Sequence, residues 1–142
     1  MTAAELTKQL QTLAIKRDVL PSSIDDATLG AMLFDAARTI AVDHDVTERE
    51  ATDALSAWLT GDGGMLRYDA VELRRQLVDW QFIVRDGFGR AYRRAPVAPA
   101  RFTEVCMLAA TLDFSQLIAD ARARDAELRA ARKAAHMGRL AA

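Results

Sequence analysis

The chain has 142 residues, of which 51% are apolar and 27% are charged, and its net charge is −1. This composition is typical of a globular protein, excludes an intrinsically disordered chain, and provides no overall positive charge for binding nucleic acid. The charges are unevenly distributed. Residues 1–66 carry 5 Lys or Arg against 11 Asp or Glu, residues 67–101 carry 8 against 4, and residues 102–142 carry 6 against 5. A basic segment therefore follows an acidic one.

The sequence contains no pattern that predicts catalysis or metal binding. The only cysteine, Cys106, lies in an apolar run, which predicts a buried and unreactive thiol. His44 and His136 are isolated, and no phosphate-binding glycine loop is present. We therefore expect no enzyme activity, no cofactor and no metal. Since no signal core and no stretch of about 20 apolar residues occurs, we also expect a cytoplasmic protein without a membrane-embedded part.

The first half of the chain predicts three helices. Residues 2–16 place leucines at helical spacing behind a capping box formed by Thr2 and Glu5. A second helix is expected from Asp25 to about residue 42. A second capping box, formed by Thr47 and Glu50, predicts the start of a third helix.

The second half predicts a helix followed by a hairpin and two more helices. After a glycine-rich loop at 61–64, residues 68–80 have helical periodicity, with Asp69 as the expected cap. The period then changes to two, and turn residues at 86–89 separate two short strands, which predicts a β-hairpin over 82–94. Pro96 and Pro99 indicate a linker, after which helices are expected over 102–112 and 113–136.

The helix and hairpin carry a family resemblance. YDAVELRRQLVDW, residues 68–80, followed by FIVRDGFGRAYRR, residues 82–94, resembles the bacterial domain of unknown function 2087 family. The resemblance extends more loosely back to Leu29, and the chain departs from the family at Trp80 and in its C-terminal helical segment. Members occur alone or fused behind ArsR-type helix-turn-helix regulators, which implies a winged-helix-like fold and an association with transcription. The resemblance supplies no ligand and no catalytic residue.

Pattern and resemblance together predict a mainly α (α+β) protein. A winged helix-turn-helix core is expected at residues 22–95, with an N-terminal helix at 1–20 and a C-terminal helical extension at 96–142.

In such a fold the helix at 68–80 would be the recognition helix. Arg75 could pair with guanine and Gln76 with adenine, but Glu72 and Asp79 fall on the same face. The alternative is a solvated face on which Glu72 pairs with Arg75 or Gln76.

Arg74 falls inside the apolar arc of the same helix. It is expected to form a structural ion pair, with Asp35, Asp53 or Asp79 as the candidate partner.

The hairpin concentrates positive charge and is the stronger candidate for contacting phosphates. Phe88 at its turn is expected to be an exposed aromatic side chain that could stack, insert or fold back over the strands. The alternative is that the arginines only protect an edge strand from pairing. With the two candidate base readers, the predicted nucleic-acid-binding residues are Arg67, Arg75, Gln76, Arg85, Phe88, Arg90, Arg93 and Arg94.

A heptad spacing in the last helix predicts a seam that includes Leu117, Ala121, Leu128 and Ala131. This seam could form a homodimer or dock onto the chain's own domain. The sequence therefore favours a small bacterial DNA-binding or transcription-associated regulator. The alternative is a protein–protein interaction module that uses the same scaffold.

Overall fold

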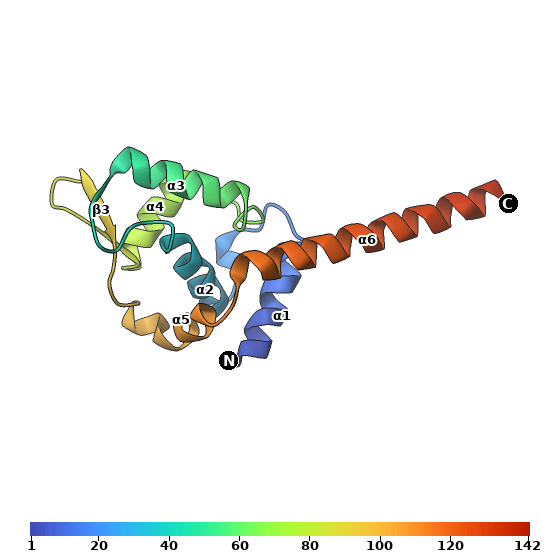
Figure 1. Ribbon diagram of the computed structural model, residues 1–142, viewed down its shortest axis with the longest axis horizontal. Coiled ribbons are helices and arrows are strands. Elements are labelled where there is room, and N and C mark those ends of the chain that lie inside the picture. The colour runs from blue at the N-terminus through green and yellow to red at the C-terminus, as the bar shows by residue number, and fades with distance from the viewer.

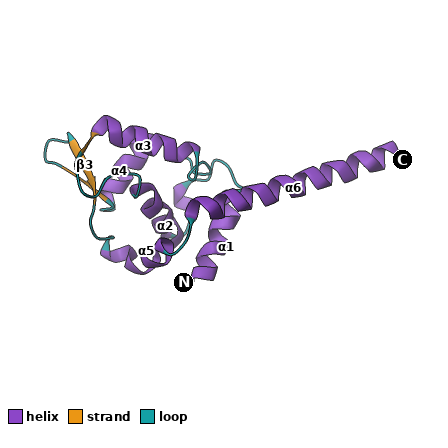
Figure 2. Ribbon diagram, in the orientation of Figure 1, coloured by secondary structure: helices purple, strands orange, loops and turns teal.

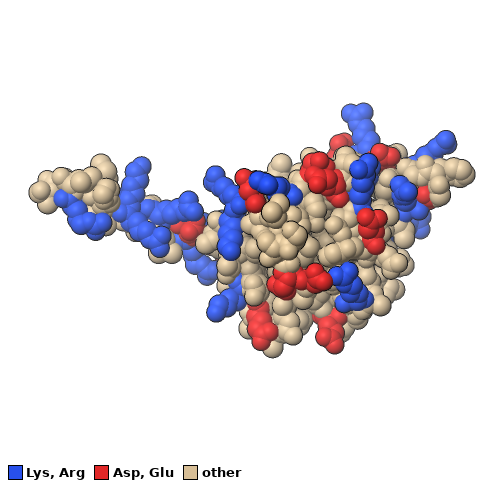
Figure 3. All heavy atoms as spheres, turned by 180° about the vertical axis from the view of Figure 1, so that it is seen from behind, with Lys and Arg blue, Asp and Glu red and all other residues tan.

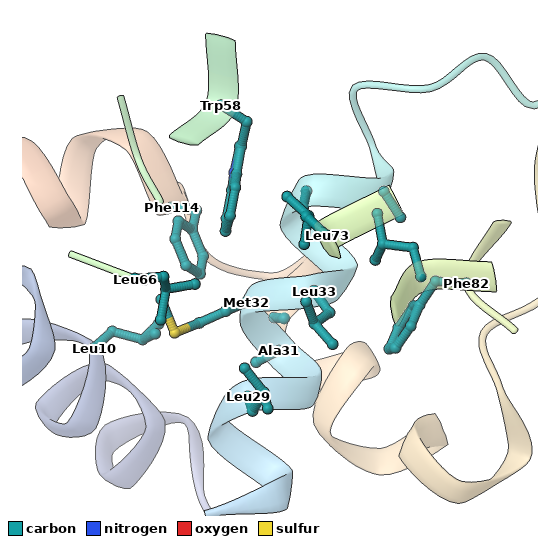
Figure 4. Close-up of a cluster of buried hydrophobic side chains, with 14 of the residues drawn as sticks. Leu10, Leu29, Ala31, Met32, Leu33, Trp58, Leu66, Leu73, Phe82 and Phe114 are labelled. Carbon is teal, nitrogen blue, oxygen red and sulfur yellow. The ribbon is translucent and has the colours of Figure 1, made fainter. Parts of the chain in front are cut away.

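A central helix, α2 (Asp26–Ala37), organises the core of the computed structural model, which describes residues 1–142. Asp25 caps this helix by accepting the backbone N–H of Thr28 at 3.0 Å. Apolar side chains occur around most of its circumference, so the helix is buried by neighbours on several sides. Figure 4 shows Leu29, Met32 and Leu33 of this helix surrounded by side chains from other elements.

Three helices come from the two ends of the sequence, namely α1 (Ala3–Ala14), α5 (Thr103–Ala110) and α6 (Phe114–Ala141). α1 and α5 pack on α2, and α6 packs on α1. The predicted capping box of Thr2 and Glu5 is confirmed, with both reciprocal hydrogen bonds present. One hydrophobic core contains residues from the N-terminal helix, the central segment and the C-terminal helices.

Two helices and a small sheet complete the other end of the molecule (Figure 2). The helices are α3 (Glu48–Thr60) and α4 (Ala70–Asp79), which pack on each other. The strands β1 (Val46–Thr47), β2 (Ile83–Arg85) and β3 (Ala91–Arg94) form an antiparallel sheet in the order β1-β3-β2. The protein is therefore mainly helical α+β, with six helices and a three-stranded antiparallel sheet. Short 3-10 turns occur at Pro21–Ser23 and Ala100–Phe102.

Two predicted helix ends differ from the structure. The second helix ends at Ala37 rather than near residue 42, because the backbone N–H groups of Thr39 and Ile40 each bond to the carbonyl three residues earlier. The Thr39 hydroxyl also donates to the carbonyl of Ala36, at 2.7 Å, and Ile40 is buried just beyond. The last helix runs to Ala141 rather than to residue 136.

The predicted dimer seam is partly occupied by the chain itself. Ala121 is buried and Leu117 is half-buried against the chain's own core, whereas Leu128 is exposed. Leu117 and Ala121 therefore pack within the chain, as the docking alternative expects. A dimer through the remaining exposed part of the helix stays a prediction.

Cys106 is buried as predicted, and burial raises the pKa of its thiol to about 11. No single helix has the length and apolar character of a membrane span; only α5 and α6 taken together do, as a pair bent by 66°.

Candidate nucleic-acid interface

A groove of about 430 Å³ separates the C-terminal half of α4 from the hairpin. The sequence brings these two elements together because only a short turn at Trp80–Phe82 joins α4 to β2. In this turn Gln81 has a positive φ of 68°, and Phe82 is buried. The residues that line the groove are Glu48, Arg74, Arg75, Val78, Asp79, Arg85, Phe88, Gly89 and Tyr92.

Arg74 forms the floor of this groove and joins α4 to α3. Its guanidinium lies 3.3 Å from the carboxylate of Glu48, donates to the Thr52 hydroxyl at 2.7 Å, and lies over the ring of Tyr92. The predicted structural ion pair is therefore confirmed. The proposed partners were wrong, because the start of α3 brings Glu48 to this position while Asp35 accepts bonds from Trp58 and Arg38.

We expect Arg74→Ala to lower the free energy of unfolding by about 2 kcal/mol, because it removes a charge-assisted hydrogen bond and the packing of a buried side-chain stem. Urea unfolding followed by tryptophan fluorescence would measure this. Arg49→Ala is the control, because Arg49 on α3 is 92% exposed. Equal midpoints for the two variants would rule out a structural role for Arg74.

The register of the hairpin distributes its arginines over different surfaces. Arg85 lies opposite Tyr92 and Val84 lies opposite Arg93, and directly opposed residues share a face of the sheet. Tyr92 is buried against the helices, so Arg85 is on the face toward α4, where it lines the groove. Arg93 is on the outer face and pairs with Asp45 at 3.1 Å.

Arg94 lies at the other end of β3 from the turn. Its backbone N–H donates to the carbonyl of Ala41, and its side chain lines a separate depression beside Phe34 and the proline linker. The structure therefore does not bring Arg93 and Arg94 to the groove.

The hairpin turn presents an aromatic side chain and a cation together. Phe88 is 84% exposed, and the guanidinium of Arg90 lies 5.8 Å from its ring centre. The backbone N–H of Arg90 donates to the carboxylate of Asp86 and lowers the pKa of that carboxyl, so the acid stays ionised inside its own turn. The turn is thus structured by Asp86, while Phe88 and Arg90 remain available at its surface.

Glu72, one of the two acids predicted on the outward face of α4, has a structural role at the start of the helix. Glu72 and Asp69 form a capping box, and the backbone N–H of Glu72 lowers the pKa of the Asp69 carboxyl. The alternative pairing of Glu72 with Arg75 or Gln76 is not present. Arg75 is exposed beside the groove, and Gln76 is half-buried.

Arg67 lies away from the hairpin. It precedes the start of α4, whereas the hairpin follows the end of that helix, and its backbone N–H donates to the carbonyl of Val19. The groove therefore unites Arg75, Arg85 and Phe88, and Arg90 lies beside Phe88 at the hairpin turn. Glu48 and Tyr92 were not among the predicted site residues. Their places at the groove depend on the pairing of β3 with both β1 and β2.

The comparisons identify one family. The family described as "Uncharacterized protein conserved in bacteria (DUF2087)" matches residues 25–94. Neither the curated proteins nor the solved structures gave a match. The matched segment begins at the cap of α2 and ends at the last residue of β3, so it includes both walls of the groove. The chain therefore contains a bacterial DUF2087 domain at residues 25–94.

Proposed function

We propose that residues 25–94 form a winged helix-turn-helix domain that binds duplex DNA and serves as a small bacterial transcription-associated regulator. The element order α2-β1-α3-α4-β2-β3 and the pairing of β1 with β3 support the fold assignment. In this arrangement α4 is the recognition helix, and β2, β3 and their turn are the wing.

The observation that carries the proposal is the pair Arg75 and Arg85. The two side chains come from the recognition helix and the wing, line the same groove, are exposed, and form no ion pair within the chain. Two unpaired guanidinium groups on facing walls suit the phosphates of a DNA backbone. Arg75, with Gln76 beside it, could also contact base edges.

A second candidate is a protein–protein interaction module on the same scaffold. The exposed apolar side chains of the wing favour it, since Val84 is 48% exposed and Phe88 is 84% exposed. Asp79, which also lines the groove, would repel a phosphate. Protein binding through an apolar wing predicts an affinity that changes little with salt.

Salt dependence distinguishes the two candidates. We expect the full chain to bind a fluorescent duplex at 50 mM salt, with an affinity that falls as salt rises. Arg85→Gln and Arg75→Gln should each reduce the slope of log K against log salt by about 0.9 and weaken binding by roughly tenfold at 50 mM. Fluorescence anisotropy titrations at several salt concentrations would measure both quantities.

Lys8→Gln is the matched control, because it removes one charge from an exposed position on α1 outside the groove. It should leave the slope unchanged. Absence of duplex binding at 50 mM salt, or groove variants that behave like Lys8→Gln, would contradict the proposal.

A further inference from the structure

The last helix leaves the body of the protein halfway along its length. Phe114, Ile118 and Ala121 are buried, and Arg122 and Asp125 are half-buried. Every residue from 126 to 142 is exposed, and Figure 1 shows this part of α6 projecting away from all other elements. At about 1.5 Å per residue the free part extends roughly 24 Å.

The free part is basic on one face. Residues 126–142 contain four Lys or Arg and one Glu. At about 100° per residue, the basic side chains fall within an arc of about 120°, while Glu127 and most of the alanines lie outside it. This tail basic face consists of Arg129, Arg132, Lys133, His136 and Arg139.

The tail basic face continues into a hollow on the body. This hollow, of about 430 Å³, is lined by Lys16 and Arg17 at the end of α1 and by Arg122 and Arg129 of α6, with Asp125 as its one acid. Figure 3 shows Lys and Arg side chains along the projecting helix and near its junction with the body.

Arg122 fixes the direction of the helix relative to the hollow. Its guanidinium donates to the carbonyl of Ala14 at 3.1 Å and to that of Gly61 at 3.0 Å, at the C-terminal ends of α1 and α3. Asp125 pairs with Arg129 at 2.9 Å. Arg132, Lys133 and Arg139 form no ion pair, so their charges are available to an external partner.

We propose that the tail basic face and its hollow are a second contact surface for the phosphate backbone of duplex DNA. Cations that recur every three or four residues along a straight helix complement closely spaced phosphates. The free part has only three large apolar side chains, Leu128, Met137 and Leu140, and they do not form the continuous apolar face that inserts a helix into a membrane surface. The cationic face of a second copy would repel this one. The surface lies at the other end of the molecule from the wing (Figure 1).

This inference rests on the proposed binding of duplex DNA by the chain, and variants of the tail and of the groove test the two surfaces separately. In duplex titrations with the full chain, Arg132→Gln/Lys133→Gln/Arg139→Gln should reduce the salt slope by up to about 2.7 and weaken binding more than tenfold at 50 mM salt. Arg124→Gln is the matched control on the same helix, since Arg124 is exposed and outside the basic arc. Glutamine keeps the helix propensity close to that of the original residues, and circular dichroism would verify the helix content.

The possible results distinguish the tail surface from the groove. A chain that binds duplex through Arg75 and Arg85, but whose triple variant matches Arg124→Gln, would overturn the tail surface and leave the groove intact. Loss of binding in the triple variant, with no effect of the groove variants, would support the tail and overturn the groove. A triple variant that alters the sedimenting mass but not the salt slope would assign the tail to self-association and overturn the inference. No duplex binding by the unmodified chain would overturn both.

Discussion

Gly63→Ala is expected to lower the free energy of unfolding by about 3 kcal/mol, because the added methyl group has no room. A β-carbon at residue 63 would lie 2.2 Å from Cζ3 and 2.3 Å from Cε3 of Trp58. The indole cannot move away easily. Trp58 is 6% exposed, and its Nε1 donates to the Asp35 carboxylate at 2.9 Å. The backbone N–H of Gly63 also donates to the carbonyl of Trp58 at 2.9 Å, which holds the loop against the ring.

Gly87→Ala is the matched control, because a β-carbon at that position in the hairpin turn meets no atom within 4 Å. Its effect should stay within about 0.5 kcal/mol. Urea denaturation of both variants would give the comparison. Equal stabilities would mean that the loop at residues 61–64 can shift away from Trp58 without destabilising the protein, which would contradict the prediction.

The helix starts were predictable because their signals are local. Thr47 and Glu50 are three residues apart in the sequence, and the two hydrogen bonds of their capping box form within one turn of helix. The same applies to Thr2 with Glu5 and to the cap at Asp69. Strand β1 was missed because Val46–Thr47 has no pattern of its own. It exists through its pairing with Tyr92 and Ala91, which lie more than 40 residues later in the chain.

The sequence predicted which helix and hairpin form the candidate site, but not which of their side chains line it. The hairpin and its arginines were found from periodicity and charge. A count of charges, however, cannot show that Arg85 faces α4 while Arg93 pairs with Asp45 on the outer face. The register of the two strands decides which face each arginine occupies, because the register states which residues of β2 and β3 lie opposite each other. Arg74 shows the same limit, since its place on an apolar helix face predicted an ion pair but only the packing of α3 on α4 selects Glu48.

The last helix shows how a regular sequence pattern can be divided by the fold. Leu117, Ala121, Leu128 and Ala131 share one spacing, but the first two lie against the body and the last two project beyond it. Periodicity describes which side chains share a helix face. It does not show how far along the helix other elements pack against that face.

Trp58→Phe is expected to cost about 3 kcal/mol of unfolding free energy, because it removes a hydrogen bond to a carboxylate and leaves part of the indole volume empty. Asp35 is only 9% exposed, and without the indole N–H it keeps Arg38 as its only side-chain partner. Trp80→Phe is the control, since Trp80 is half-buried and stacks on Phe102 with ring centres 5.1 Å apart. A phenyl ring can preserve that stacking, so this change should cost less than about 1 kcal/mol.

Each variant retains one tryptophan, so fluorescence reports unfolding in both. Asp35→Asn separates the two contributions at Trp58, because the amide oxygen can still accept the indole N–H while the charge is lost. A cycle of Trp58→Phe, Asp35→Asn and the double variant measures the part of the loss that depends on the carboxylate charge. If Trp58→Phe costs no more than Trp80→Phe, the Trp58–Asp35 bond does not stabilise the packing of α3 on α2. The position of α3, and of the Glu48 side chain that pairs with Arg74 in the groove, would then depend on the other contacts of α3, among them the hydrogen bond from Arg74 to Thr52.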